Sequence, residues 1–107
     1  MANAIHLTDD SFNSEVLESK LPVLIDFSTP WCGPCKVLSP IIDELSVEMA
    51  GIVKFCKIDA DEHPNASIEY GVRSMPTMLI FKDGAHIDTI VGAAPKKQII
   101  ERLKANI

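Results

Sequence analysis

The sequence predicts an α/β protein with a mixed central sheet of about five strands and helices on both faces. The first observation is an alternation of apolar runs with helix-period segments over residues 4–70, in the order βαβαβα. The second is a hairpin signal, Lys82-Asp83-Gly84, between two further apolar runs. The third is a final amphipathic segment, which completes the chain as ββα. Alternation predicts parallel strands, and the hairpin adds antiparallel ones.

Composition limits the chain to one domain, residues 1–107, with a single core. Apolar residues make up 47% and charged residues 23%, as in ordinary globular proteins. The net charge of −5 argues against sequence-independent nucleic-acid binding, which needs clustered basic residues. No apolar run approaches the roughly 20 residues of a membrane span, and the N-terminus lacks signal-peptide features. We expect a cytoplasmic monomer that binds neither nucleic acid nor membranes.

The N-terminal third predicts strand, helix and strand. Residues 4–7 read as a short strand, after which Thr8 or Asp9 can cap a helix that ends near residues 21–22. Residues 23–27 form a near-continuous apolar run, as expected of a strand covered on both faces. The apolar residues of the helix are Phe12, Val16 and Leu17.

The middle third predicts a long helix from Gly33 to Gly51. Pro34 suits its first turn, where no intrahelical N–H is needed. Apolar residues then recur at intervals of three and four, and a glycine closes the segment. These apolar residues are Val37, Leu38, Ile41, Ile42, Leu45 and Met49.

The remaining elements follow the same alternation. Residues 52–58 predict a strand and residues 64–70 a short helix. Residues 77–81 and 87–91 are the two hairpin strands. Pro95 opens the last helix, whose inward face carries Ile99, Ile100, Leu103 and Ile107.

Two cysteines lie where the second strand passes into the long helix, in Trp31-Cys-Gly-Pro-Cys35. Free amides and the positive dipole end at a helix start stabilise a thiolate, so Cys32 should ionise easily. Only the thiolate attacks a disulfide, and Cys35 is close enough to bond Cys32 as the resolving thiol. Gly33 leaves Cys32 uncrowded, and Pro34 stiffens the loop.

The same spacing also occurs in zinc sites and structural disulfides. Zinc needs two further ligands, usually as a second pair. Four other candidates exist, but none is paired at ligand spacing: Cys56, His6, His63 and His86. Cys56 is expected to be a small buried hydrophobe. A calcium-like group, Asp59, Asp61 and Glu62, lacks the loop glycine and terminal bidentate acid, so we expect a solvated turn.

The pentapeptide WCGPC at a strand-to-helix turn resembles the motif of the thioredoxin family, and the resemblance covers essentially the whole chain. It also includes Val23-Leu-Ile-Asp-Phe27, Lys57-Ile-Asp-Ala-Asp61, Tyr70-Gly-Val-Arg-Ser-Met-Pro-Thr77, Phe81-Lys-Asp-Gly84 and Val91-Gly-Ala93. The resemblance implies the thioredoxin fold and a protein-disulfide reductase that serves cell redox homeostasis. Cys32 would attack a target disulfide and Cys35 would resolve the mixed disulfide.

The resemblance also implies partners and excludes a bound cofactor. The redox group would be the Cys32–Cys35 disulfide itself, with no metal. Oxidised proteins would be the substrates, and an NADPH-linked or ferredoxin-linked thioredoxin reductase would reset the pair.

Asp26 is unusual because a carboxylate inside a central strand is expensive to bury. It is either an edge residue that reaches water or, as the resemblance implies, a buried proton acceptor behind Cys35. Burial would raise its pKa and suit it to that role. Lys57, on the neighbouring predicted strand, either pairs with Asp26 or extends into solvent.

The resemblance implies a cis Pro76 packed against the cysteine pair, with the backbone of Met75 holding an extended substrate segment. For Met75, core packing is an equally good interpretation. Gly84 and Gly92 also suit turns and close packing. The expected apolar docking rim is made of Trp31, Val72, Met75, Pro76, Gly92 and Ala93.

One departure from the family is Ser28-Thr29, where thioredoxins usually have Trp-Ala. It is expected to alter local rigidity, potential or partner choice. Related oxidants and isomerases tend to carry histidine between the cysteines, and glutaredoxins Pro-Tyr, whereas this chain has Gly33-Pro34. A non-catalytic role as a subunit or chaperone-like module is the alternative from another class.

Overall fold

The computed structural model describes residues 3–107 and contains one five-stranded sheet in the order β1-β3-β2-β4-β5. The strands are β1 Ile5–Leu7, β2 Val23–Ser28, β3 Lys54–Asp59, β4 Thr77–Lys82 and β5 Ala85–Val91. β1, β3 and β2 run parallel, whereas β4 is antiparallel to both β2 and β5. The predicted mixed sheet and element order are confirmed.

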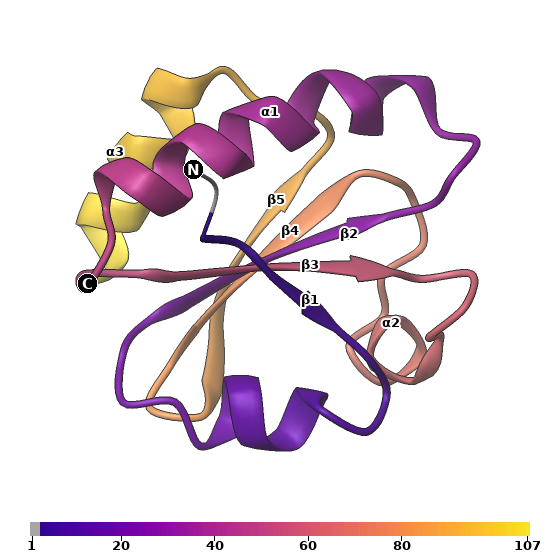
Figure 1. The fold of residues 1–107 in the computed structure, drawn as a ribbon, viewed down its shortest axis with the longest axis horizontal. Coiled ribbons are helices and arrows are strands. Elements are labelled where there is room, and N and C mark those ends of the chain that lie inside the picture. Colours follow the sequence, from indigo (N-terminus) through magenta and orange to yellow (C-terminus); the bar gives the residue numbers. More distant parts are fainter. Residues whose placement is uncertain (1–2) are drawn as a thin grey trace.

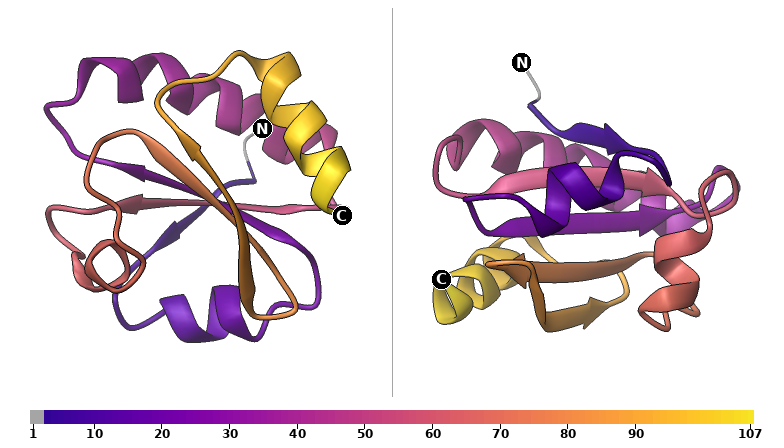
Figure 2. Two further views of the ribbon diagram at one scale, coloured as in Figure 1. Left: turned by 180° about the vertical axis from the view of Figure 1, so that it is seen from behind. Right: turned by 90° about the horizontal axis from the view of Figure 1, so that it is seen from below.

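Helical segments cover both faces of the sheet. They are η1 Asn13–Leu17, α1 Gly33–Glu48, α2 Asn65–Glu69 and α3 Lys96–Asn106. Figure 1 shows α1 and α3 on one side of the strands, and η1 and α2 on the other. The views in Figure 2 show the same two layers from behind and from below.

Two apolar clusters fill the spaces between the sheet and these layers. Leu24 of β2 belongs to the cluster under α1 and α3, and Ile25 belongs to the cluster under η1 and α2. Successive residues of β2 therefore face opposite layers, and both layers are buried. This explains why residues 23–27 read as a continuous apolar run instead of an alternating one.

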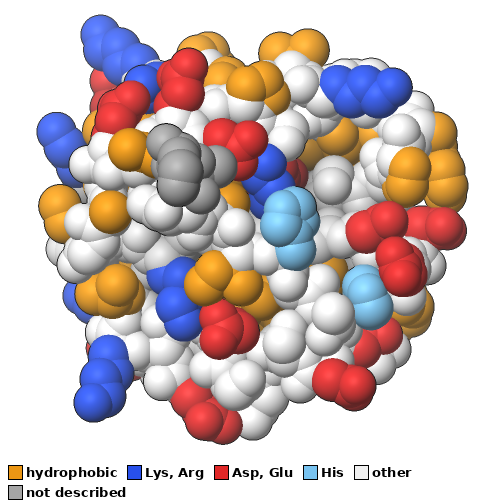
Figure 3. Space-filling view, viewed as in Figure 1, with side chains coloured by type: hydrophobic (Ala, Val, Ile, Leu, Met, Phe, Trp, Pro, Cys, Tyr) orange, Lys and Arg blue, Asp and Glu red, His pale blue; other side chains and the backbone are white. Residues whose placement is uncertain are grey.

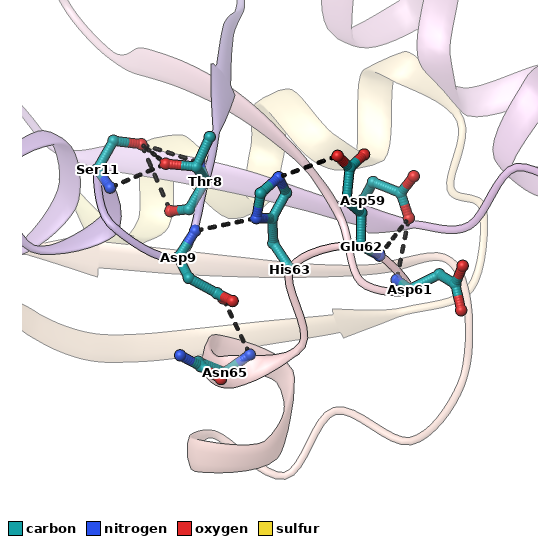
Figure 4. A network of polar contacts seen from close by, with 8 residues as sticks. All are labelled: Thr8, Asp9, Ser11, Asp59, Asp61, Glu62, His63 and Asn65. Atoms are coloured by element: carbon teal, nitrogen blue, oxygen red, sulfur yellow. Dashed lines mark hydrogen bonds and ion pairs between the residues drawn. The ribbon is translucent and has the colours of Figure 1, made fainter.

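The first helical segment is shorter than expected. It is one π-helical turn, in which the N–H of Glu18 donates to the carbonyl of Asn13 at 3.1 Å, and it stops at Leu17. Thr8 Oγ1 accepts a hydrogen bond from the N–H of Ser11 at its entry. Asp9 does not cap this segment: its Oδ1 accepts from the N–H of Asn65, at the start of α2 (Figure 4).

Two apolar positions that were expected to face inward lie at the surface. Val37 is exposed because it falls outside the buried stripe of Leu38, Ile42 and Leu45 on α1. Ile107 is exposed, and it follows the last residue of α3.

The predicted hairpin turn joins β4 and β5. Asp83 and Gly84 have φ values of 52° and 79°, the pattern of a two-residue type I′ turn. Glycine is required at position 84 for two reasons. Its positive φ disfavours other residues, and a Cβ would lie 2.9 Å from the carbonyl oxygen of Leu17.

Candidate active site

The cysteine pair lies where β2 ends and α1 begins. Cys32 is the N-cap of α1, and its Sγ accepts a hydrogen bond from the N–H of Cys35 at 3.2 Å. The N–H of Cys32 donates to the carbonyl of Thr29. The two sulfurs form a disulfide, with the Cα atoms 5.3 Å apart. The predicted position at a helix start is confirmed.

The two cysteines differ in exposure. Cys32 is partly exposed, whereas Cys35 is only 4% exposed. In the described part of the chain, no atom lies within 4 Å of where a Cβ on Gly33 would be, and Pro34 is exposed. A disulfide of another molecule can therefore approach Cys32 more easily than Cys35.

Trp31 is 70% exposed beside the pair. Figure 3 shows hydrophobic side chains at the end of the molecule where Figure 1 places the loop between β2 and α1.

Asp26 is buried in the middle of the sheet. It lies in β2 between β3 and β4 and is 1% exposed, so the interpretation as an edge residue is wrong. Burial raises the pKa of its carboxyl group from 3.8 to about 6, while Lys57 opposes this rise and Asp43 adds to it. Within residues 3–107 no group donates a hydrogen bond to Asp26 Oδ1.

Lys57 faces Asp26 across the parallel strands but binds other groups. The two residues are Cα partners in β2 and β3. The ammonium lies 2.7 Å from Asp43 Oδ1 and 2.6 Å from Ser39 Oγ, both in α1. Its side chain is 12% exposed, so it does not extend into solvent. Of the two alternatives for Lys57, the structure shows neither: the ammonium pairs with Asp43.

Sequence reasoning missed Ser39 and Asp43 as members of this cluster. They are four residues apart on α1, and that spacing places two side chains on one helix face. This spacing could have revealed the cluster. Two polar side chains on the face of α1 that lies against the sheet imply a polar partner in the sheet.

The Met75–Pro76 peptide bond is cis, and Pro76 is buried. The carbonyl of Pro76 accepts a hydrogen bond from the N–H of Gly92 at 2.8 Å, which joins the two loops of the expected rim. Val72 and Met75 are partly buried against the cluster under η1 and α2, and Ala93 is exposed. Met75 therefore combines core packing with partial exposure.

The other candidate ligands serve structural roles. Cys56 is fully buried, and burial raises the pKa of its thiol to about 12. Asp59 Oδ1 accepts hydrogen bonds from the N–H groups of Asp61 and Glu62, whose side chains are exposed, so the expected solvated turn is confirmed (Figure 4).

His63 is partly buried and makes two polar contacts with neighbouring residues. Its Nδ1 accepts a hydrogen bond from the N–H of Asp9, and its Nε2 lies 3.9 Å from a Glu62 carboxylate oxygen (Figure 4). Over residues 3–107 no three His, Cys, Asp or Glu side chains come together as a metal site. None of the helices in that range is long and apolar enough to cross a membrane.

Comparisons with known proteins extend the geometric argument to the whole chain. The family model described as thioredoxin matches residues 3–105. "Thioredoxin" of Rickettsia felis is 51% identical over 107 residues, and "Thioredoxin 1" of Synechococcus elongatus is 46% identical over 107 residues; both alignments cover all of each chain. "Thioredoxin M-type, chloroplastic" of Chlamydomonas reinhardtii is 46% identical over 103 residues, which are 96% of this chain and 74% of that protein.

These matches confirm the resemblance carried by WCGPC. A family-wide match, together with a redox-capable cysteine pair at the start of α1, defines the activity as protein-disulfide reduction. The chain belongs to the thioredoxin family and is a thiol–disulfide oxidoreductase whose redox centre is the Cys32–Cys35 pair.

Proposed function

We propose that Cys32 is the attacking thiolate and Cys35 the resolving thiol of this protein-disulfide reductase. The observation that carries the assignment is their unequal exposure at the start of α1: Cys32 is partly exposed and Cys35 is buried. The N–H of Cys35 points at Cys32 Sγ, where it would also stabilise negative charge on the thiolate.

The reaction then proceeds in two displacements. The Cys32 thiolate attacks one sulfur of a substrate disulfide, which breaks that disulfide and releases a substrate thiolate. Cys35 loses its proton and attacks Cys32 Sγ in the mixed disulfide, which releases the second substrate thiolate. The two electrons of the dithiol pass to the substrate, and the Cys32–Cys35 disulfide remains.

Asp26 is the proposed acceptor of the Cys35 proton, directly or through water. Its burial in β2 and its pKa of about 6 support this role, because the group is mostly a carboxylate at neutral pH yet is more basic than an ordinary aspartate. Lys57 is proposed to support it by modulating its charge.

The proposed docking rim consists of Trp31, Val72, Met75, Pro76, Gly92 and Ala93. The exposed indole of Trp31 and the hydrogen bond between Gly92 and Pro76 support it. The backbone of Met75 makes no hydrogen bond to another backbone group of residues 3–107. It is therefore available to an extended substrate segment. Gly33 and Pro34 shape the approach to Cys32.

The proposed partners are oxidised proteins and a thioredoxin reductase that is NADPH-linked or ferredoxin-linked. Membership of the family supports both kinds of partner. Residues 1–107 are proposed to act as one monomeric domain in the cytoplasm, where a reducing environment keeps the pair cycling.

Trapping with Cys35→Ser tests the assignment. This variant keeps the proposed nucleophile but not the resolving thiol, so it should hold substrate proteins as mixed disulfides through Cys32. Mass spectrometry of the captured peptides identifies the linking cysteine, and Cys32→Ser is the matched control. Capture by Cys32→Ser, with none by Cys35→Ser, would reverse the assigned roles.

A further inference from the structure

Lys57 lies between two carboxylates and bonds to only one of them. Its strand partner across β2 and β3 is Asp26, yet its ammonium is held by Asp43 and Ser39 of α1. Contacts of 2.7 and 2.6 Å are charge-assisted hydrogen bonds of good length. The lysine cation is therefore directed toward the helix, and Asp26 has no ion-pair partner among residues 3–107.

We propose that Asp43 and Ser39 are positioning residues that hold the Lys57 ammonium away from Asp26 and thereby keep the Asp26 carboxylate basic enough to take the Cys35 proton. The inference rests on the proton-accepting role proposed above for Asp26. Asp43 and Ser39 would act only through Lys57 and Asp26, without touching the substrate.

The groups around Asp26 make this arrangement effective. On the β4 side its partner is Met78, which carries no charge. On the β3 side stands Lys57, whose ammonium is held by Asp43 and Ser39 of α1. Among residues 3–107, Lys57 and Asp43 are the charges that shift the pKa of Asp26, and they act in opposite directions. The position of one ammonium decides the balance between them.

Release of the lysine would change the chemistry of Asp26. An ammonium that moved onto the Asp26 carboxylate would stabilise its charged form and lower its pKa. A weaker base takes a proton from Cys35 with less driving force, so the resolving step would slow near neutral pH.

The test is a double-mutant cycle in which the measured quantity is the pKa of Asp26. The carboxyl carbon of Asp26 is followed by NMR between pH 3 and pH 9 in the wild type and in Asp43→Asn, with Asp26→Asn to assign the signal. We expect Asp43→Asn to lower this pKa by about one pH unit, because charge removal frees Lys57 to approach Asp26. The exposed Asp61→Asn removes the same charge elsewhere and should leave the pKa unchanged.

Lys57→Met separates positioning from the direct repulsion between Asp43 and Asp26. Removal of Asp43 in the Lys57→Met background abolishes only the direct repulsion, so the pKa should fall by clearly less than in the wild type. Equal falls in the two backgrounds would overturn the proposal, as would no fall in the wild type. Ser39→Ala, which keeps both charges, should lower the pKa by a smaller amount.

Kinetics distinguish this proposal from the role assigned to Asp26. In Asp43→Asn, the acid limb of the pH–rate profile for disulfide reduction should move to lower pH by the same amount as the pKa. If Asp26→Asn reduces disulfides at the wild-type rate, Asp26 does not accept the Cys35 proton. Asp43 and Ser39 then have no effect on the reaction rate through Asp26. The cycle still decides independently whether Asp43 positions Lys57.

Discussion

Arg102 of α3 binds Asp88 of β5 through two hydrogen bonds, from Nε to Oδ2 at 2.8 Å and from Nη2 to Oδ1 at 2.6 Å. Asn106 Nδ2 donates a third bond to the same carboxylate, and Arg102 also donates to the carbonyl of Thr89. These contacts hold the last helix against the edge strand of the sheet. The hydrogen bonds from Arg102 are the main reason why the pKa of Asp88 falls from 3.8 to about 2.

Asp88→Asn should reduce stability in a pH-dependent way. The folded-state pKa lies below the unfolded value, so the stabilisation is complete above about pH 4 and is lost as pH falls toward 2. Because Arg102 is more than a third exposed, we expect a discounted loss of about 1 kcal/mol at pH 7. Urea unfolding at pH 7 and pH 2 measures it, with Asp61→Asn as the control. A loss that is equally large at pH 2 would contradict the linkage.

Asp26→Ala should have the opposite pH dependence. The folded-state pKa of Asp26 is raised from 3.8 to about 6, so the buried charge destabilises the fold above about pH 6 and not below pH 4. The shift corresponds to a penalty of about 3 kcal/mol, which the substitution removes. The small cavity that it leaves reduces this gain in stability by about 1 kcal/mol. The variant should be more stable than the wild type at pH 7 and no more stable at pH 4.

The same variant should turn over more slowly with a protein disulfide, because Cys35 loses its proton acceptor. Denaturant unfolding at the two pH values and a reductase assay are the measurements. A stability gain that persists at pH 4 would show that burial of the charge is not its source. A wild-type turnover rate would remove Asp26 from the mechanism.

Gly84→Ala should destabilise the protein more than Gly51→Ala does. Both glycines have a positive φ, 79° and 81°, so either substitution strains the backbone by about 1 kcal/mol. Only at Gly84 would the new Cβ meet another atom, the carbonyl oxygen of Leu17 at 2.9 Å. The excess loss, measured by thermal or urea unfolding, should be about 1 to 2 kcal/mol. Equal losses would mean that the contact with Leu17 relaxes freely.

The sequence predicted those features of the fold that depend on local pattern. The apolar run in β2, the stripe on α1 and the Asp83-Gly84 turn each carry their own signal within a few residues. The early end of η1 and the hydrogen bond from the N–H of Asn65 to Asp9 carry no such signal. Asp9 and Asn65 lie 56 positions apart, so the fold must bring them together first.

In the active site, too, the sequence predicted what depends on neighbouring residues and did not predict what depends on packing. The position of Cys32 at a helix start followed from its neighbours in the chain, because a strand, a turn and a helix stand in sequence there. The partner of Lys57 did not follow, since Asp26 and Asp43 are both within reach and the choice depends on side-chain packing between α1 and β3.

Cys56 should be inert in the folded protein. It is fully buried in β3, and its raised pKa of about 12 keeps the thiol protonated at neutral pH. We expect no alkylation of Cys56 in the native oxidised protein and full alkylation after unfolding, as measured by intact mass. Cys56→Ala should keep the reductase activity and lose about 1 kcal/mol of stability. Rapid native alkylation would show that β3 opens to solvent.

Trp31→Ala should impair the reduction of protein disulfides without destabilising the fold. Its indole is 70% exposed beside Cys32, so its removal leaves no cavity in the core, and the change in unfolding free energy should stay below about 0.5 kcal/mol. A large docking side chain contributes about 1 to 2 kcal/mol to binding, so kcat/KM for a protein disulfide should fall about tenfold. A small aromatic disulfide, which is too small to span the rim, should be reduced nearly as fast as by the wild type. Ile52→Ala is the matched control, because Ile52 is also exposed but follows the other end of α1. If Trp31→Ala slows both substrates equally, the indole supports the cysteine pair itself and does not dock the partner.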